Sequence, residues 1–352
     1  MMIALKVMER VLGLLGIAAL TSCSVIDEDL SDCDKQAKMD YELRLVTNMN
    51  TEMKTQLTTE TDLKLEHALR QYLGGVFTDF AHDVDLSFYD TRDDSLRLQH
   101  DEHIMDANQA SYTLNLPMRR YMHLATANIL DNDLVTLEDD ERCHRSRLQQ
   151  VDRDTIASHS TGIFTARQPM EVLEGVDQNF DVHLYMANCA AMLVLDPRGY
   201  DTDGVQVYST GFATGFNICD SSYVYPTKSP IVRTERIEAG DGSQESGDEV
   251  GFCSVTFPSR DEKGTRTVIE TEEPFIAKES DESFWEFRVY VLQEDGSITE
   301  TTLRIKKPLR AGQLMIIKGW LADRGIVMVE DQLVGVSVTL DWNKKSQGDV
   351  EL

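Results

Sequence analysis

The chain is short of positive charge, of aromatic residues and of long apolar runs. Its 34 lysines and arginines face 61 aspartates and glutamates, so the formal net charge is −27. This acidity argues against nucleic acid as a partner, because the phosphates would be repelled. Beyond the N-terminus the longest apolar run is residues 186–195, whereas a helix needs about 20 such residues to span a bilayer. We therefore expect an acidic, soluble body that does not bind nucleic acid.

Motifs of catalysis and cofactor binding are also missing. The sequence has no G-x-S-x-G, no H-E-x-x-H, no glycine-rich phosphate loop and no C-x-x-C pair. Asp201 and Asp203 match the start of a calcium loop, but Phe212 stands where that loop needs a glutamate. His100 and His103 would lie on opposite faces of a strand and share a face only on a helix. We expect no enzyme activity, no cofactor and no metal site.

Six cysteines are spaced irregularly, and the sequence alone does not pair them. If Cys23 carries lipid, five remain, so at least one is unpaired or pairs between chains. Cys189 lies among alanines and is expected to pack as a small apolar side chain. The pairing stays open for Cys33, Cys143, Cys189, Cys219 and Cys253.

The N-terminus carries the pattern of an exported lipoprotein. Lys6 and Arg10 precede an uncharged stretch, residues 11–20, that has the length of the apolar core of a secretion signal. Ser22 and Cys23 then match the lipobox of bacterial lipoproteins. We expect residues 1–22 to be a signal peptide, cleaved between Ser22 and Cys23, and Cys23 to become an N-palmitoyl, S-diacylglycerol cysteine. Several acyl chains give stable anchoring. The alternative is an ordinary secretion signal with a chance cysteine.

An acidic tether is expected over residues 23–38, because Asp27-Glu28-Asp29 and Asp32 follow the lipid cysteine closely. Such a cluster is similar to the surface-export signal of lipoproteins in some Gram-negative anaerobes. It predicts a lipid-anchored, surface-exposed protein of the outer membrane.

The remaining chain alternates apolar and polar residues in short stretches, which predicts β-strands. Ala190–Leu195 is wholly apolar, which predicts a central strand buried on both faces. Glu294-Asp295-Gly296, between two such stretches, predicts a hairpin turn. One helix is predicted from an apolar stripe that runs from Leu65 to Leu73 and ends at Gly74-Gly75. We predict an all-β fold of two sandwiches: residues 39–172 with the helix, and residues 173–345, followed by a polar tail, 346–352. The charged segment 131–147 is expected to be an exposed excursion.

Several of these features together resemble the fimbrillin-associated anchor proteins, which are lipoproteins at the base of fimbriae. The resemblance rests on Cys23, Ile26 and Asp29–Cys33, on Asp85–Asp90 and Tyr121–Asn128, and on the closing segment Val334–Trp342. It implies two tandem transthyretin-like or Ig-like sandwiches. It also implies an outer-membrane protein that holds the first pilin subunit of a fimbria, with regulation of fimbria length as a further role.

The rival function is that of a surface glycan-binding lipoprotein from a polysaccharide-uptake system, since those proteins are also acidic, lipidated and built of β-sandwiches. An exposed row of tryptophans would favour it. Trp285, Trp320 and Trp342 all fall in predicted strands, which favours core packing instead.

The segment Val334–Trp342 is our candidate docking strand. The alternative is that it simply completes the second sandwich, and both hold if its outer edge stays open. Its residues 334, 336, 338 and 340 are apolar and share one face. An edge strand offers unpaired N–H and C=O groups to an added strand, which supplies affinity through main-chain hydrogen bonds. We expect Ser337 and Thr339 to point away from the apolar face, and proline at these positions to remove donors from the open edge.

Overall fold

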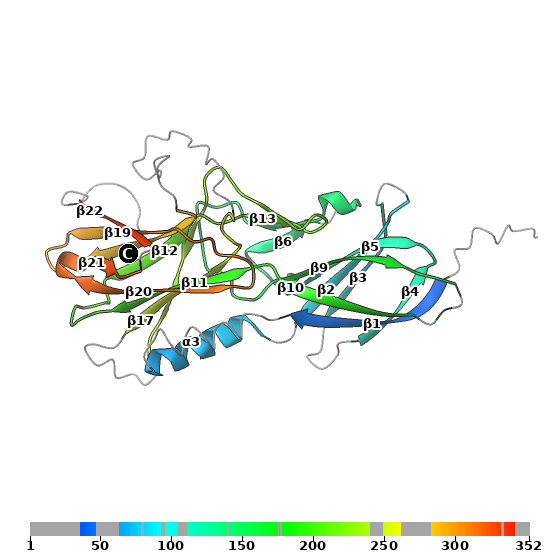
Figure 1. Cartoon of the computed structure of the whole chain (residues 1–352), viewed down its shortest axis with the longest axis horizontal. Coiled ribbons are helices and arrows are strands. Elements are labelled where there is room, and N and C mark those ends of the chain that lie inside the picture. The colour runs from blue at the N-terminus through cyan, green and yellow to red at the C-terminus, as the bar shows by residue number, and fades with distance from the viewer. Residues whose placement is uncertain are drawn as a thin grey trace, which may run out of the picture.

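The computed structural model describes residues 36–46, 63–78, 81–92, 96–104, 111–138, 141–174, 176, 178–239, 249–261, 283–331 and 334–341. Within these residues the chain forms four β-sheets and one α-helix, α3 (Leu63–Val76). The molecule is elongated, and two β-sandwiches follow each other along its long axis (Figure 1). The predicted all-β class with sandwich domains is confirmed.

The first sandwich is one seven-stranded sheet that folds back on itself, in the order β3–β2–β5–β9–β10–β1–β4. β9 and β10 pair only beside Met186, and the sheet separates there into two layers. Phe88 of β2 and Leu184 of β10 are fully buried in the shared core. The strands are β1 (Gln36–Val46), β2 (Asp83–Asp90), β3 (Leu96–Ile104), β4 (Ser111–Pro117), β5 (Arg120–Ala127), β9 (Phe164–Glu171) and β10 (Asn179–Met186).

The membership of β10 differs from the sequence prediction. β10 pairs in parallel with β1, from Asp40–Asn179 to Val46–Tyr185, so a boundary at 172/173 would divide this sheet. The reason is that a parallel pairing between distant segments leaves no local signal. Alternation along β10 shows that one face is buried, and it does not say which strand lies beside it.

The second sandwich packs a five-stranded sheet, β16–β17–β11–β20–β21, on a six-stranded sheet, β22–β19–β18–β12–β15–β8. The first of these comprises β11 (Cys189–Asp196), β16 (Glu235–Ile237), β17 (Val250–Thr256), β20 (Leu314–Ala322) and β21 (Ile326–Val329). The second comprises β8 (Thr155–Ile156), β12 (Val205–Thr210), β15 (Ile231–Arg233), β18 (Trp285–Leu292), β19 (Ile298–Ile305) and β22 (Val334–Asp341).

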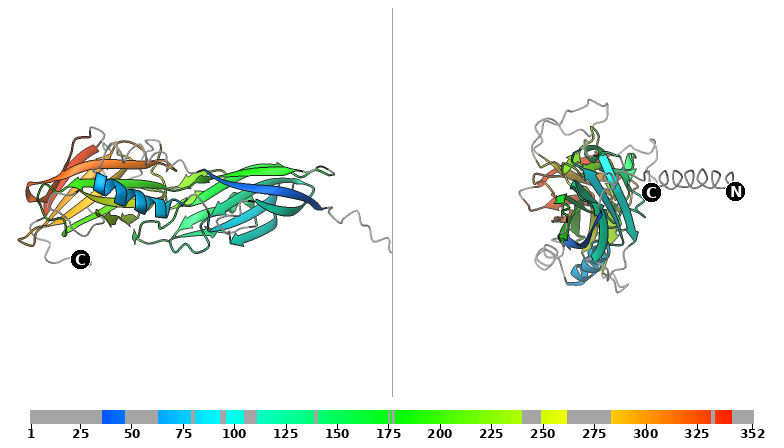
Figure 2. Two further views of the ribbon diagram at one scale, coloured as in Figure 1. Left: turned by 90° about the horizontal axis from the view of Figure 1, so that it is seen from below. Right: turned by 90° about the vertical axis from the view of Figure 1, so that its right-hand side faces the viewer.

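The central strand β11 is buried on both faces, as its apolar sequence predicted. Leu193 contributes to the core between the two sheets, whereas Met192 belongs to the cluster that includes Leu69 and Leu73 of α3. Figure 2 shows α3 lying across the sheet of the second sandwich. The helix exists where it was predicted, but it covers the second sandwich and not the first. Its apolar stripe required a buried partner without specifying which one.

A four-stranded sheet, β14–β13–β7–β6, lies at the junction of the two sandwiches. It comprises β6 (Val135–Glu138), β7 (Arg147–Gln150), β13 (Gly215–Asn217) and β14 (Ser222–Val224). Val135, Leu148 and Cys143 are buried, and Cys143 forms a disulfide with Cys219. The prediction that residues 131–147 form an exposed excursion is therefore right only in part. Several of its residues are exposed, namely Asp131, Asp133, Thr136, Glu138, Glu141, His144 and Arg145, but Val135, Cys143 and Ser146 are buried. The few apolar residues of this segment are enough to bury part of it, because the distant strand β13 and the disulfide cover them.

Two further cysteines are buried and free. Cys189 lies in the core between the sheets, and Cys253 lies in the cluster beneath α3. Burial raises the pKa of both thiols well above the usual value, so neither is a ready thiolate. Cys189 thus packs as a small apolar residue, as predicted. Cys23 and Cys33 lie outside the described residues.

Candidate functional site

The C-terminal strand β22 forms one edge of the six-stranded sheet. It pairs antiparallel with β19 over its whole length, from Val334 opposite Ile305 to Asp341 opposite Ile298. Among the described strands, none pairs with its other side. Within the described residues, the candidate docking strand therefore completes the second sandwich and also leaves one edge unpaired.

The partner strand β19 is held by a tight hairpin with β18, which confirms the turn predicted at Glu294-Asp295-Gly296. Gly296 adopts a φ of 79°, a conformation that glycine tolerates without strain. The Asp295 carboxylate accepts hydrogen bonds from the Ser297 hydroxyl at 2.6 Å and from the Ser297 N–H at 2.8 Å. These two bonds lower the pKa of Asp295. The hairpin fixes the register that β22 then follows.

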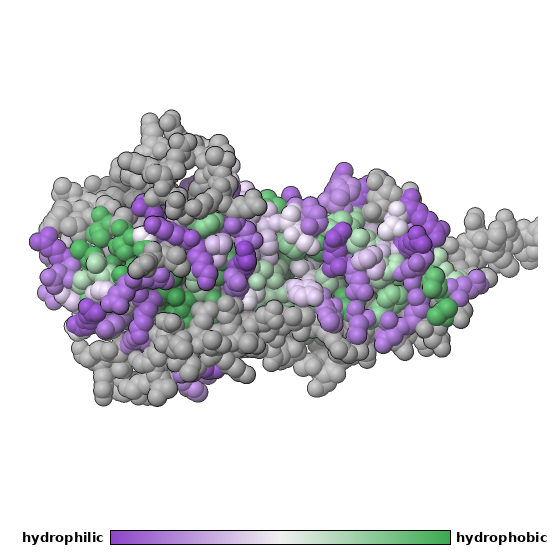
Figure 3. All heavy atoms as spheres, in the orientation of Figure 1, coloured by the Kyte–Doolittle hydropathy of each residue, from purple (hydrophilic) through white to green (hydrophobic). Residues whose placement is uncertain are grey.

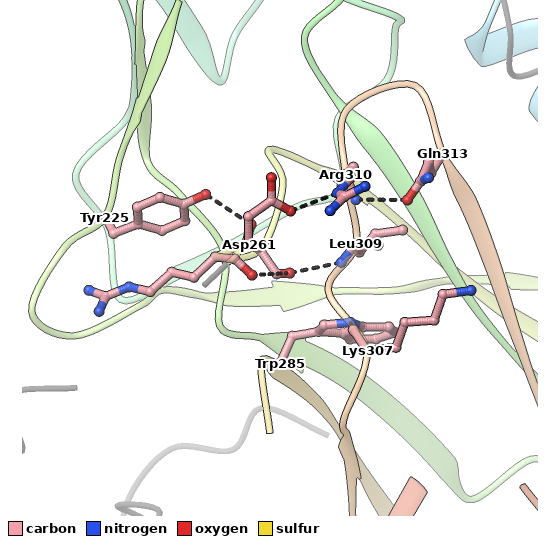
Figure 4. A network of polar contacts seen from close by, with 9 residues as sticks. Tyr225, Asp261, Trp285, Lys307, Leu309, Arg310 and Gln313 are labelled. Carbon is pink, nitrogen blue, oxygen red and sulfur yellow. Dashed lines mark hydrogen bonds and ion pairs between the residues drawn. The ribbon is translucent and has the colours of Figure 1, made fainter. Parts of the chain in front are cut away.

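The loop between β19 and β20 is also fixed by hydrogen bonds and an ion pair (Figure 4). The indole N–H of Trp285 donates to the carbonyl of Lys307 at 3.0 Å. Arg310 forms an ion pair with Asp261 at 3.0 Å, and the N–H of Leu309 donates to the Ser259 hydroxyl at 2.9 Å. Because this loop is pinned, the end of β19 beside the start of β22 has a defined position.

The hairpin determines which residues of β22 form backbone hydrogen bonds to β19 and which point away from it. We call this alternation the hydrogen-bond phase of β22. In antiparallel pairs, residues that exchange hydrogen bonds alternate with residues that do not. Gln293 donates its N–H to the Ser297 carbonyl at 2.8 Å, so residues 299, 301, 303 and 305 of β19 bond β18. Residues 298, 300, 302 and 304 then bond residues 341, 339, 337 and 335 of β22.

The backbone groups of residues 336, 338 and 340 consequently point toward the open edge. Val334 fits this phase, since its N–H donates to the Asp331 carbonyl at 3.0 Å and not to β19. The proposed proline test at Ser337 and Thr339 is therefore wrong. Proline there would remove bonds that hold β22 to β19, whereas the open donors belong to residues such as Val336 and Val338.

The open edge also carries an apolar stripe. Val336 and Val338 are 38% and 40% exposed, although they lie opposite Leu303 and Thr301, which are fully buried. Met328 of the nearby strand β21 is 40% exposed. Figure 3 shows hydrophobic surface gathered over the end of the molecule that holds β19, β21 and β22. Main-chain groups and apolar side chains thus line one edge, which suits an added strand with alternating apolar residues.

The outer face of the six-stranded sheet next to this edge is polar and highly ordered. Arg288 pairs with Glu286 at 2.8 Å, and both side chains are largely buried. Burial, followed by the nearby Glu300 carboxylate, raises the pKa of Tyr290 to about 12. Because these side chains pair with one another, the face offers few free polar groups, and the groups left for a partner strand are those of the edge.

The other sequence candidates do not come together. β3 runs through both His100 and His103, which agrees with the strand alternative. The Asp201 carboxylate accepts the Asp203 N–H at 2.9 Å in a turn before β12. The structure as described holds no group of three or more His, Cys, Asp or Glu side chains placed to bind a metal. Ser22, Cys23 and Trp342 lie outside the described residues.

The two described tryptophans form no exposed row. Trp285 is fully buried, and the ring of Trp320 is covered by the Arg198 guanidinium, 4.3 Å from the ring centroid. No helix in the described part of the chain is long and apolar enough to cross a membrane.

No family model matches the chain, and no curated protein matches it. A candidate adhesin from Bacteroides thetaiotaomicron has a TM-score of 0.50 at 10% identity, covering 86% of this chain and 97% of its own. The fimbrial anchor protein Mfa2 from Porphyromonas gingivalis has a TM-score of 0.45 at 9% identity, covering 87% and 98%. A candidate polysaccharide-binding protein from Bacteroides thetaiotaomicron has 0.48 at 9%, covering 85% and 97%. The likeness at 0.50 shows a shared fold.

Proposed function

We propose that this chain is a lipid-anchored subunit of the outer membrane that holds a fimbrial subunit at the cell surface. In this proposal Cys23 carries the N-palmitoyl and S-diacylglycerol groups, and the tether over residues 23–38 leads to the two sandwiches. The subunit binds its pilin partner through the open edge of β22. The protein then acts as a structural subunit and not as an enzyme.

The observation that carries the proposal is the edge of β22. Among the described strands, this eight-residue strand pairs only with β19, and its residues Val336 and Val338 are exposed. The alternation of antiparallel hydrogen bonds directs the main-chain groups of residues 336, 338 and 340 outward. Long, flat, apolar edges are normally covered or blocked, because they recruit strands from other chains. An edge left in this form suits a protein whose task is to bind another subunit. The lipobox resemblance and the shared fold with a candidate adhesin support the same assignment.

The test is replacement of Cys23 with alanine in the producing bacterium. We expect the variant to take up no labelled palmitate, and fimbriae to appear in the culture medium instead of on the cells. Electron microscopy of cells and medium gives the readout. A matched control is Cys253→Ala, since Cys253 is buried and far from the lipobox in sequence. Fimbriae that stay on cells carrying the unlabelled Cys23→Ala variant would contradict anchoring.

A further inference from the structure

A second surface, unconnected with the β22 edge, lies where β9 and β10 separate. The two strands pair at Thr165–Tyr185 and Phe164–Met186 and then diverge into opposite layers. A groove of about 750 Å³ opens between them. It is bordered by Arg167 and Gln168 on β9, by His183 and Tyr185 on β10, and by Phe216 and Ile218 of the junction sheet.

Two polar side chains at this groove, Arg167 and His183, are not engaged elsewhere in the described part of the chain. Arg167 and His183 are exposed, and within the part of the chain that the structure describes neither side chain forms a hydrogen bond or an ion pair. Tyr185 is 57% exposed, more than any other large hydrophobic residue in the described part of the chain. Because Asp181, His183 and Tyr185 alternate along β10, they lie on the same outward face.

The opposite wall is rigid. Ile218 donates its N–H to the Ser146 carbonyl at 3.1 Å, next to the disulfide of Cys143 and Cys219. The hydroxyl of Tyr223 donates to the carbonyl of Ala187 at 2.7 Å, which joins the junction sheet to the end of β10. A groove whose walls are cross-linked in this way keeps its shape before a ligand arrives, and preorganisation lowers the cost of binding.

We propose that this groove binds a saccharide. A sugar ring offers an apolar C–H face, which packs on an aromatic ring such as Tyr185, and hydroxyls at its rim. Arg167 and Gln168 can donate to these hydroxyls, and His183 can donate or accept. Binding sites of this type combine apolar contact with a few polar groups that set orientation. The site is separate from the fimbrial function proposed above, and neither depends on the other.

A peptide strand suits the groove less well. Thr165 of β9 bonds β10, so residues 167 and 169 direct their backbone toward the opening. Residue 169 is Pro169, which has no N–H to donate. An inserted strand would lose its ladder after one residue of β9, whereas a saccharide needs side chains and not a continuous ladder.

The test is calorimetric titration of the full chain with malto-, cello-, manno- and xylohexaose and with trigalacturonate. We expect at least one of them to bind with a Kd below about 1 mM. Tyr185→Ala should weaken that binding at least about tenfold, and Arg167→Ala should weaken it as well. Because both side chains are exposed, thermal melting should be unchanged, which excludes misfolding as the cause. Tyr200→Ala is the matched control, since Tyr200 is 41% exposed on the second sandwich.

Either of two results overturns the proposal. The first is no saturable binding of any saccharide in the panel. The second is binding that Tyr185→Ala and Arg167→Ala leave unchanged, which would place the saccharide elsewhere. Cells that produce Tyr185→Ala should still carry fimbriae, because that variant keeps Cys23 and β22 intact. Loss of saccharide binding with fimbriae retained thus separates this inference from the anchoring proposal.

Discussion

Cys143 and Cys219, which are 76 positions apart in the sequence, are joined by a disulfide, with their Cα atoms 5.7 Å apart. The two cysteines lie beside β7 and β13, neighbours in the sheet at the junction of the sandwiches. The same apolar cluster contains Tyr89 and Leu124 of the first sandwich and Phe257, which follows β17 of the second. The disulfide therefore cross-links the chain at the junction of the two sandwiches.

Replacing both cysteines with serine should lower the free energy of unfolding by about 2–4 kcal/mol, because the unfolded chain gains freedom. Urea unfolding monitored by circular dichroism measures the change. The control is the parent protein with and without dithiothreitol, since Cys189 and Cys253 are buried and already free. A parent that is equally stable in both conditions would contradict a stabilising bond.

Proline substitutions should separate the two sides of β22. Ser337→Pro removes an N–H that bonds β19 and should cost about 1–3 kcal/mol. Val338→Pro removes only an outward N–H, which edge strands tolerate, so stability should change far less. Urea unfolding of both variants gives the comparison. Equal losses would mean that the phase assigned to β22 is wrong.

The same pair of variants tests docking with a purified fimbrial subunit. Val338→Pro should weaken binding at least about tenfold, which corresponds to about 1.4 kcal/mol. Val338→Ala is the control, because it shortens the side chain and keeps the backbone donor. A folded Val338→Pro protein that binds as well as the parent would move the docking site away from this edge.

The helix should stabilise the second sandwich. Leu69 is fully buried against the sheet of β11 and β17, and Gly251 of β17 lies directly beneath it. Leu69→Ala should cost about 2–5 kcal/mol through lost burial and the cavity left behind. Gln71 is exposed on the same helix, and Gln71→Ala should change stability by less than about 0.5 kcal/mol. Thermal melting of both variants measures the two changes. An effect of Leu69→Ala as small as that of Gln71→Ala would contradict the packing of α3 on the sheet.

Two buried histidines predict loss of stability in mild acid. His123 stacks on Phe88 with ring centroids 4.3 Å apart, and burial lowers its pKa from 6.5 to about 4. His159 is equally buried, with its pKa also lowered to about 4. Between pH 6.5 and 4 the unfolded chain binds protons that the folded chain does not, so stability falls as pH falls. Each histidine should cost about 2 kcal/mol between pH 7 and pH 5.

Urea unfolding at the two pH values measures this loss. His123→Asn should reduce it by about half, whatever its effect at pH 7, because one titrating group is gone. His67→Asn is the control, since His67 is exposed on α3. An unchanged difference between pH 7 and pH 5 in His123→Asn would show that His123 titrates normally in the folded protein.

Local pattern was sufficient for single elements of this protein. The apolar stripe from Leu65 to Leu73 predicted α3, and the run from Ala190 to Leu195 predicted a strand buried on both faces. The turn at Asp295-Gly296 predicted the β18–β19 hairpin, because glycine and a capping aspartate act within a few residues. These features depend on interactions between residues close together in the chain, and such interactions can be read directly from the sequence.

Partners far apart in the sequence were decided only by the tertiary structure. β10 beside β1, α3 on the second sandwich, and Cys143 beside Cys219 all join segments whose own patterns would suit several partners. The same holds for the groove at Tyr185, since its walls come from strands that separate and from a distant sheet. Alternation shows that a face must be buried, whereas the partner is chosen by packing of the whole chain. The sequence by itself therefore determined single elements such as α3, β11 and the β18–β19 hairpin, and only the fold decided which surfaces were left open.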